Sequence, residues 1–381
     1  MVANITILCD FDASKRPRPA RLIEMIKHTY RLSVIAKECT PIDGVHTFSF
    51  PAMPTAKDRT PQQNQALKEY CQNGAFEKLI FTPNRLCIRE YLAALPPQHL
   101  LIVEDITLLP FALEYRLTHP QAKILIDLRE YYPLEYENSK EWLDSFGLFF
   151  YHLCAVYLPQ VDRTLCVSEG IARAYYENFG IQSNLFLSLP PLYDFSPTPL
   201  GTPIEILYHG FVSPDRSSQN LIELAHKLPS EYVLYAMVLS NQPKFLESLC
   251  TKAPSNLIFL PPVSLEQIVP FSHRFDIGLI PFFPTTFNLM HCLPNKFFEY
   301  IQARLCVVST PLSEIKQFIA KEPCGVCSKD YSIDSLVETL LALRRDEIAA
   351  YKAKAHTLAY TYNMQHNKDK ILYIIADMLG V

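Results

Sequence analysis

The feature that most constrains the fold is an alternation of short apolar runs with longer amphipathic stretches. In the first half of the chain, apolar runs that indicate strands lie at 5–9, 32–36, 78–81, 100–104, 123–127 and 165–168. Helical spacing occupies intervening segments such as 21–30 and 169–179. Short strands that alternate with helices predict a parallel sheet covered by helices on both faces.

A proline-rich interruption divides this pattern into two halves. Prolines at 190, 191, 197, 199 and 203 surround Gly201, which is the composition of a linker. The alternation then restarts, with strands expected at 204–209, 232–238, 257–260, 276–281, 305–310 and 325–327. We therefore predict an N-terminal α/β domain over 1–190, a linker over 191–203 and a second α/β domain over 204–360. Residues 361–381 read as a C-terminal helix, a candidate to pack back on the first domain.

Composition narrows the classes of partner. The net charge of −4, from 35 basic and 39 acidic residues, gives no global field for nucleic acid. The 11 cysteines are scattered singly apart from Cys324 and Cys327, which favours a reducing compartment over disulfides or a zinc site. No signal-peptide pattern or apolar run of roughly 20 residues is present. We expect a cytoplasmic protein, with peripheral contact at the inner face of a membrane left open. Phe146–Leu158, apolar all round, is expected to be a buried helix.

The densest chemical pattern is Pro294-Asn295-Lys296-Phe297-Phe298-Glu299-Tyr300, which opens a predicted helix before a β-branched strand. Backbone N–H groups at a helix start suit phosphate oxygens, and Lys296 adds a formal positive charge. Glu299, one turn later, is placed to accept hydrogen bonds from a pair of sugar hydroxyls. The alternative is an ordinary helix N-terminus with a Lys–Glu pair on its surface.

Further candidates follow other predicted strands. Gly210 allows close backbone approach after 204–209, and Arg216 is suited to clamp a diphosphate. Asp127 ends the predicted strand at 123–127, and Arg129 and Glu130 follow it; three bunched charges there indicate a solvated or paired site. A basic loop after the first strand contains Asp10, Lys15, Arg16 and Arg18.

Four segments in order carry a family resemblance. They are D-L-R-E-Y-Y-P at 127–133, L-C-V-S-E-G-I at 165–171, Y-H-G followed by Arg216, and L-P-N-K-F-F-E-Y at 293–300. Together they resemble GT-B retaining glycosyltransferases of the family-4 type, which build bacterial polysaccharides and glycoconjugates. The resemblance implies two Rossmann-like domains whose parallel sheets face each other across a cleft.

The resemblance also implies the chemistry. A sugar would be transferred from a nucleotide sugar to a glycan or lipid-linked acceptor with retention of its anomeric configuration. The nucleotide sugar would be the co-substrate, and neither a cofactor nor a metal would be needed. The turn at Pro294 and Asn295 would meet the diphosphate, and Glu299 would hold the ribose. Arg216 and Lys296 would stabilise the departing diphosphate, and domain closure about the linker would exclude water.

One position departs from the family pattern and leaves the sugar contact open. Many relatives have a glutamate eight residues before the second glutamate, where this chain has His291. Asn288 or His291 would then contact the transferred sugar, or His291 is structural.

The acceptor site and the activity also have alternatives. Asp127 is either a polar anchor or the group that activates the acceptor hydroxyl. The basic loop binds an acceptor phosphate, attracts an anionic membrane surface, or is simply solvated. The same fold would also serve a non-hydrolysing sugar-nucleotide epimerase or a catalytically degenerate binding or scaffold subunit.

Overall fold

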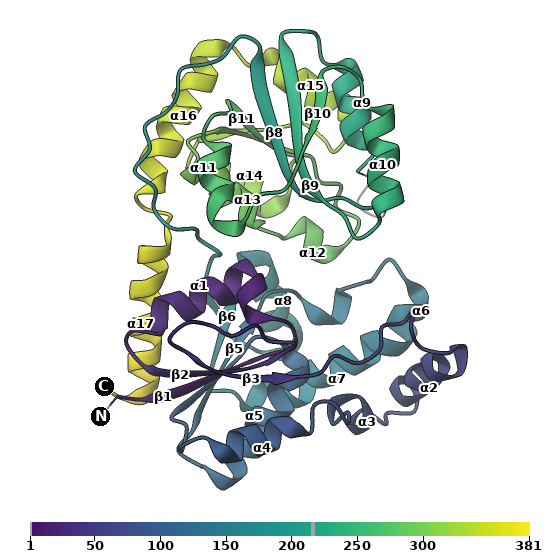
Figure 1. Cartoon of the computed structure of the whole chain (residues 1–381), viewed down its shortest axis with the longest axis vertical. Helices are drawn as coiled ribbons and strands as arrows, with labels where there is room; N and C mark the ends of the chain where they lie inside the picture. Colours follow the sequence, from purple (N-terminus) through teal and green to yellow (C-terminus); the bar gives the residue numbers. More distant parts are fainter. Residues whose placement is uncertain (1, 215–217) are drawn as a thin grey trace. The chain divides into compact units, whose positions relative to one another are not determined.

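A computed structural model describes residues 2–214 and 218–381, and the chain divides into two compact units. Unit 1 contains Met1–Leu187, Thr286–Asn288 and Asn367–Val381. Unit 2 contains Ser188–Thr285 and Leu289–His366. Each unit is an α/β structure built on its own parallel sheet (Figure 1).

The sheet of unit 1 is seven-stranded, in the order β3-β2-β1-β4-β5-β6-β7, and its paired strands are parallel. Its strands are β1 (Asn4–Cys9), β2 (Arg31–Lys37), β3 (His46–Phe50), β4 (Leu100–Val103), β5 (Lys123–Leu128), β6 (Arg163–Cys166) and β7 (Asn184–Leu185). The strand order reverses between β1 and β4. Ligands of open parallel sheets bind at the carboxyl ends of the strands beside such a reversal.

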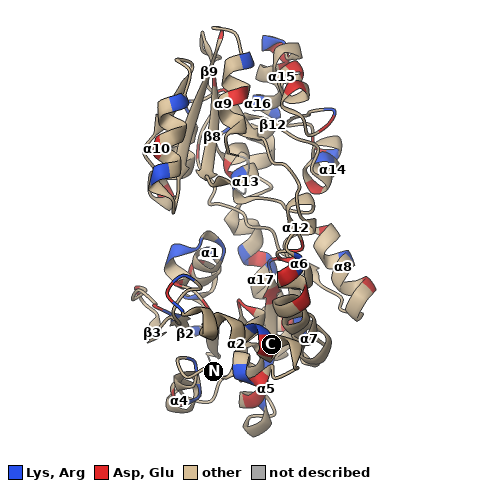
Figure 2. Ribbon diagram, turned by 90° about the vertical axis from the view of Figure 1, so that its right-hand side faces the viewer, with Lys and Arg blue, Asp and Glu red and all other residues tan. Residues whose placement is uncertain are grey.

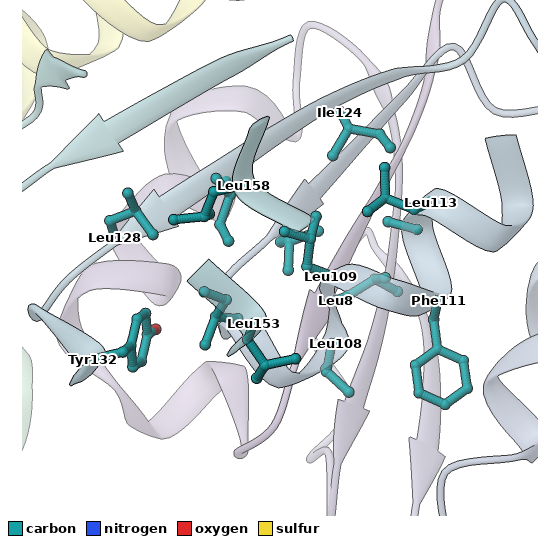
Figure 3. Packing of buried hydrophobic residues seen from close by; sticks show 14 of the residues in the cluster. Leu8, Leu108, Leu109, Phe111, Leu113, Ile124, Leu128, Tyr132, Leu153 and Leu158 are labelled. Carbon is teal, nitrogen blue, oxygen red and sulfur yellow. The ribbon is translucent and has the colours of Figure 1, made fainter. Parts of the chain in front are cut away.

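Helices cover both faces of this sheet. They are α1 (Pro17–Ile26), α2 (Pro61–Gln72), α3 (Glu77–Ile80), α4 (Cys87–Ala94), α5 (Leu109–Thr118), α6 (Lys140–Trp142), α7 (Leu148–Tyr157), α8 (Glu169–Phe179) and, from Asn367 on, α17 (Met364–Leu379). In Figure 1, α1 and α17 lie on one side of the sheet and α4 and α5 on the other. Figure 3 shows part of the main apolar cluster, where Leu8 of β1 lies among Leu109 of α5 and Leu153 of α7.

Unit 1 differs from the structure predicted from sequence at four places. The run at 78–81 is not a strand: residues 78–80 belong to α3 and Phe81 follows its end, because a short apolar run does not distinguish the two states. The alternating run at β3 is a strand that the sequence reading missed. The basic loop already becomes helical at Pro17, a residue whose fixed φ suits the first turn. The helix predicted over 146–158 is only half buried, since Tyr151 is 55% exposed. Among the described residues, no helix is both long and apolar enough to span a bilayer.

Unit 2 has a six-stranded parallel sheet in the order β10-β9-β8-β11-β12-β13. Its strands are β8 (Ile204–Phe211), β9 (Tyr232–Leu239), β10 (Leu257–Leu260), β11 (Ile277–Ile280), β12 (Cys306–Ser309) and β13 (Gly325–Cys327). All six strands lie at the predicted apolar runs, because strands of a parallel sheet covered on both faces have apolar residues at successive positions.

The helices of unit 2 also form two layers. They are α9 (Asn220–Lys227), α10 (Pro243–Lys252), α11 (Ile268–Ser272), α12 (Phe287–Met290, whose first two residues belong to unit 1), α13 (Asn295–Gln302), α14 (Ser313–Lys321), α15 (Ile333–Ala342) and α16 (Arg345–Ala359). Helices α9, α10 and α15 cover one face, and α11, α13 and α16 cover the other (Figure 1). Acidic and basic residues are interspersed over the helices of both units (Figure 2).

The proline-rich segment before β8 is held firmly on unit 2. Arg304, which is fully buried, donates to the carbonyls of Tyr193 at 2.6 Å and Phe195 at 3.2 Å. Lys352 donates to the Thr198 hydroxyl at 2.9 Å and to a carboxylate oxygen of Asp276 at 3.1 Å. Buried charged side chains need such partners. The segment therefore belongs structurally to unit 2.

Candidate functional site

The carboxyl ends of β8, β11 and β12 form the polar edge of unit 2. These three strands are neighbours in the sheet, so the residues that follow them come together. Pro294 is the N-cap of α13, with extended φ and ψ of −69° and 148°, and Asn295 is the first helical residue. Two of the predicted donor-site positions thus form the helix start, whose backbone N–H groups suit an anion.

Lys296 is buried at this edge, with only 7% of its surface exposed. Its ammonium lies 4.1 Å from the ring centroid of Tyr208 and 4.7 Å from that of Phe282. Aromatic faces attract a cation and offset part of the cost of removing it from water. The positive charge is therefore held in one place before any ligand binds.

Gly210 is required by this arrangement. Its φ is 137°, in a region that other residues rarely adopt, and a Cβ built there would lie 2.9 Å from the Lys296 ammonium. The absence of a side chain lets the end of β8 approach the lysine closely.

Glu299 lies on the next turn of α13 and is 3% exposed. Its Oε2 is 3.5 Å from Nε2 of His209, another buried side chain, at the end of β8. Burial and the nearby Lys296 ammonium hold the pKa of His209 well below its usual value, so the ring is neutral. The sequence predicts His209 to lie in a strand but does not single it out as a site residue. Its position directly before Gly210 was the available signal.

The structure places the other predicted donor residues differently. Arg216 lies outside the described residues. His291 is in unit 2, where its Nδ1 is 3.2 Å from a carboxylate oxygen of Glu314 in the first turn of α14. Asn288 belongs to unit 1, where its Oδ1 accepts from the backbone N of Tyr131 at 2.7 Å and its Nδ2 donates to the Tyr131 carbonyl at 3.1 Å. The structure therefore brings Lys296, Glu299 and Gly210 together, whereas Asn288 forms its hydrogen bonds within unit 1.

The polar edge of unit 1 centres on an ion pair between Arg18 of α1 and Asp127 of β5. The guanidinium donates from Nε and Nη2 to the two Asp127 oxygens, at 2.5 and 2.7 Å. Asp127 is fully buried and Arg18 is 7% exposed. Both oxygens of Asp127 are thus occupied by Arg18, an arrangement suited to an anchor.

Two other predicted residues of the basic loop, Asp10 and Lys15, have ion-pair partners elsewhere. Asp10 pairs with Arg85 at 2.9 Å and Lys37 at 3.2 Å, two bases that the sequence reading did not select. Lys15 pairs with Asp12 at 3.0 Å, and its side chain is 72% exposed. Asp10 and Asp12 have an Asp-x-Asp spacing, but both carboxylates are engaged by these bases. In the described part of the chain, no group of three or more His, Cys, Asp or Glu side chains is placed to hold a metal ion.

Two more predicted acceptor residues follow β5, and Arg16 lies before α1. The Arg129 guanidinium is 4.5 Å from the ring centroid of Phe11, and its Nη2 is 3.8 Å from a carboxylate oxygen of Asp105. Arg16 is exposed, with its guanidinium 5.8 Å from the same Phe11 ring. Glu130 is also exposed, and its backbone carbonyl accepts from the Tyr175 hydroxyl at 2.8 Å. Arg129 is therefore near the polar edge, whereas Arg16 and Glu130 face solvent.

Glu104, directly after β4, is a buried acid that the sequence reading missed. Burial, with a further contribution from Asp127, raises its pKa to about 8, although Arg129 and Arg18 lower it. Neither of its carboxyl oxygens has a hydrogen-bond partner, and the same holds for Nη1 of Arg18, Nε of Arg129 and the hydroxyl of Tyr132. Several buried polar atoms without a hydrogen-bond partner thus lie near the carboxyl ends of the central strands of unit 1. Such groups are commonly completed by ordered water.

Comparison with solved structures identifies the fold as GT-B, with two Rossmann-like domains. The UDP-forming α,α-trehalose-phosphate synthase from Burkholderia vietnamiensis is 11% identical, with a TM-score of 0.69 over 100% of both chains. Sucrose-phosphate synthase from Thermosynechococcus elongatus is 10% identical, with a TM-score of 0.73 over 99% of both chains. Anabaena HepE, solved in complex with UDP and glucose, is 12% identical, with a TM-score of 0.64 over 98% of this chain and 99% of that chain.

The TM-scores over nearly the whole length of each chain show a shared fold, and identities of 10–12% show no more than that. No protein-family model matches the sequence, and no curated protein matches it either.

Proposed function

We propose that this protein is a glycosyltransferase that moves a sugar from a nucleotide-sugar donor to a glycan or lipid-linked acceptor, with retention and without a metal. Unit 2 binds the donor and unit 1 binds the acceptor. The observation that carries the proposal is the buried Lys296 ammonium at the start of α13, held beside Gly210 and one turn from the Glu299 carboxylate.

The donor assignment follows from the chemistry of this edge. A diphosphate carries negative charge that increases when the glycosidic bond to the sugar breaks. Lys296 and the N–H groups of the α13 N-terminus provide fixed positive charge that stabilises the leaving group. Arg216 is assigned to the same task on the sequence pattern alone. The Glu299 carboxylate accepts hydrogen bonds from the ribose hydroxyls.

The nucleotide is proposed to be a uridine diphosphate sugar. One trehalose-6-phosphate enzyme of the same fold, from E. coli, was solved with UDP-2-fluoro glucose, and HepE was solved with UDP and glucose.

The acceptor assignment rests on the polar edge of unit 1. Arg129 supplies a charge beside the Phe11 ring, and the Arg18–Asp127 pair anchors the residues after β1 and β5. Charged and aromatic groups together suit a sugar or a phosphate of a lipid-linked acceptor. Because Arg18 occupies both Asp127 oxygens, we assign Asp127 to anchoring this edge.

Nucleotide binding tests the donor site. The melting temperature is measured with UDP, GDP, ADP, CDP and CMP in turn. A ligand at 100 times its dissociation constant stabilises the folded state by about 2.7 kcal/mol, which raises the melting temperature by roughly 5–10 °C. We expect a selective rise with UDP that is lost in Lys296→Ala and Glu299→Ala. The control is Lys227→Ala, which removes an exposed lysine that pairs with Glu223 and Asp334.

Product analysis then tests the reaction. Purified protein is incubated with the selected nucleotide sugar, with and without glycan acceptors, and the anomeric configuration of the product is determined by NMR. Transfer to an acceptor with retention is expected, and an epimerised sugar nucleotide without acceptor would instead indicate an epimerase. Turnover like that of the wild type in Lys296→Ala or Glu299→Ala would overturn the site assignment.

A further inference from the structure

His209 is held rigidly at the end of β8. Its ring meets the Tyr300 ring edge-on, with centroids 5.0 Å apart and an interplanar angle of 82°. Its backbone N donates to the Tyr300 hydroxyl at 3.2 Å. The side chain is only 7% exposed. The imidazole therefore has little freedom to turn toward any other partner.

Tyr300 is itself fixed across two strands. Its hydroxyl lies 3.2 Å from the Leu207 carbonyl of β8 and 3.3 Å from the Leu279 carbonyl of β11. Its ring covers Gly278, where a Cβ would lie 2.3 Å from the ring. The glycine thus admits the aromatic ring that supports His209.

The Nε2 atom of His209 faces the Glu299 carboxylate at a distance longer than a normal hydrogen bond. It is buried without a hydrogen-bond partner, 3.5 Å from Oε2 of Glu299. A neutral imidazole beside a carboxylate favours the tautomer with the proton on Nε2, because a lone pair in that position would face negative charge. A buried donor left unpaired destabilises the site, and a small approach by Glu299 removes that cost. Hydrogen bonds in ligand-free active sites often tighten in this way when the substrate binds.

We infer that His209 is a positioning residue for Glu299: it donates from Nε2 to Oε2 when the nucleotide binds and holds the carboxylate in the plane that receives the ribose hydroxyls. This inference rests on the proposed function of the donor site. It explains why a histidine suits position 209, since a neutral donor orients the carboxylate without adding a second positive charge beside Lys296. A lysine or arginine there would compete for Glu299 and repel the Lys296 ammonium.

The test compares two nucleotides on matched variants. Dissociation constants are measured by calorimetry for UDP and 2′,3′-dideoxy-UDP, or for the equivalent pair of the nucleotide that the melting screen selects. The proteins are the wild type, His209→Gln and His209→Asn. A glutamine amide places an N–H near the position of Nε2, whereas an asparagine amide lies near that of Nδ1.

We expect the wild type to prefer the ribonucleotide by roughly ten- to hundredfold, the range for hydrogen bonds to a charged group. His209→Gln should retain most of this preference and His209→Asn should lose most of it. Affinity for the dideoxynucleotide should stay within about twofold in all three proteins, because that ligand lacks the hydroxyls that Glu299 receives.

Other results overturn the inference in distinguishable ways. Equal preference for the ribonucleotide in the two variants shows that His209 does not position Glu299. A parallel loss of affinity for both nucleotides in His209→Asn shows that His209 only supports the fold. If the wild type binds nucleotides without any preference for ribose, the Glu299 assignment fails and the inference fails with it. If the wild type binds none of the nucleotides, the proposed donor site itself is wrong.

Discussion

Replacing Asp127 by asparagine tests whether the ion pair at the polar edge of unit 1 is an anchor. The substitution preserves the shape of the side chain and removes its charge, leaving the Arg18 guanidinium buried opposite a neutral amide. Arg18 is 7% exposed, and its Nη1 already lacks a partner. Removing one member of a buried ion pair typically costs about 3–5 kcal/mol, because the other charge is left uncompensated. For a unit of this size, that loss corresponds to a fall in melting temperature of roughly 6–20 °C.

The chain provides a selective probe for this measurement. It contains 1 tryptophan, Trp142, which lies in unit 1 at the end of α6. Urea unfolding followed by tryptophan fluorescence therefore reports unit 1, even if the two units unfold separately. Asp127→Asn should lower the urea midpoint of this transition with little change in its slope.

A matched control and a double variant complete the experiment. Glu114→Gln breaks an exposed ion pair in the same unit, at 2.7 Å from Arg89, and should cost less than about 1 kcal/mol. Arg18→Met combined with Asp127→Leu should recover much of the loss, since neither charge is then left alone. A loss below about 1 kcal/mol for Asp127→Asn would refute the reasoning. So would a double variant whose loss equals the sum of the losses measured for Arg18→Met and Asp127→Leu singly.

Two further predictions concern stability. Because burial raises the pKa of Glu104 from 4.5 to about 8, the folded protein retains a proton that the unfolded chain releases, so the free energy of unfolding should fall as pH rises through this interval. Urea titrations at pH 5 and pH 8 should show a smaller fall in Glu104→Gln, and an identical fall would contradict the assignment. Gly278→Ala should destabilise unit 2 by about 3 kcal/mol or more, because the added Cβ would lie 2.3 Å from the Tyr300 ring. Circular dichroism during heating measures this loss, and an unchanged melting temperature would show that Tyr300 can move aside.

Most of the fold could be predicted from local sequence patterns. The expected helix at 169–179 and the strands at 257–260 and 325–327 have the observed bounds. These elements are buried or capped in ways that adjacent residues reveal, such as Ser168, whose side chain accepts from Ile171 N at the start of α8. Residues 78–81 were assigned to the wrong state, and the β3 strand was missed. Both are short, so contacts with distant residues decide their state more than local preference does.

The donor site was partly predictable for the same reason. Lys296 and Glu299 lie within one helical turn of each other, and their spacing with Pro294 forms a recognisable local motif. His209 lies at the end of another strand, and its relation to Glu299 arises only from the register of β8 beside β11 and the packing of α13. Glu104 likewise follows an ordinary apolar strand, and only its burial distinguishes it from a solvated acid.

The sequence by itself determined two parallel α/β units, most of their strands and the lysine–glutamate motif at a helix start. These features depend on hydrophobic periodicity and on residues close together in the chain. Tertiary structure decided which charges are buried and what each one meets. It paired Arg18 with Asp127, enclosed Lys296 between two aromatic rings and placed His209 opposite Glu299. Burial and pairing depend on the distances between elements far apart in the chain, and those distances are set only when the sheets and helices pack.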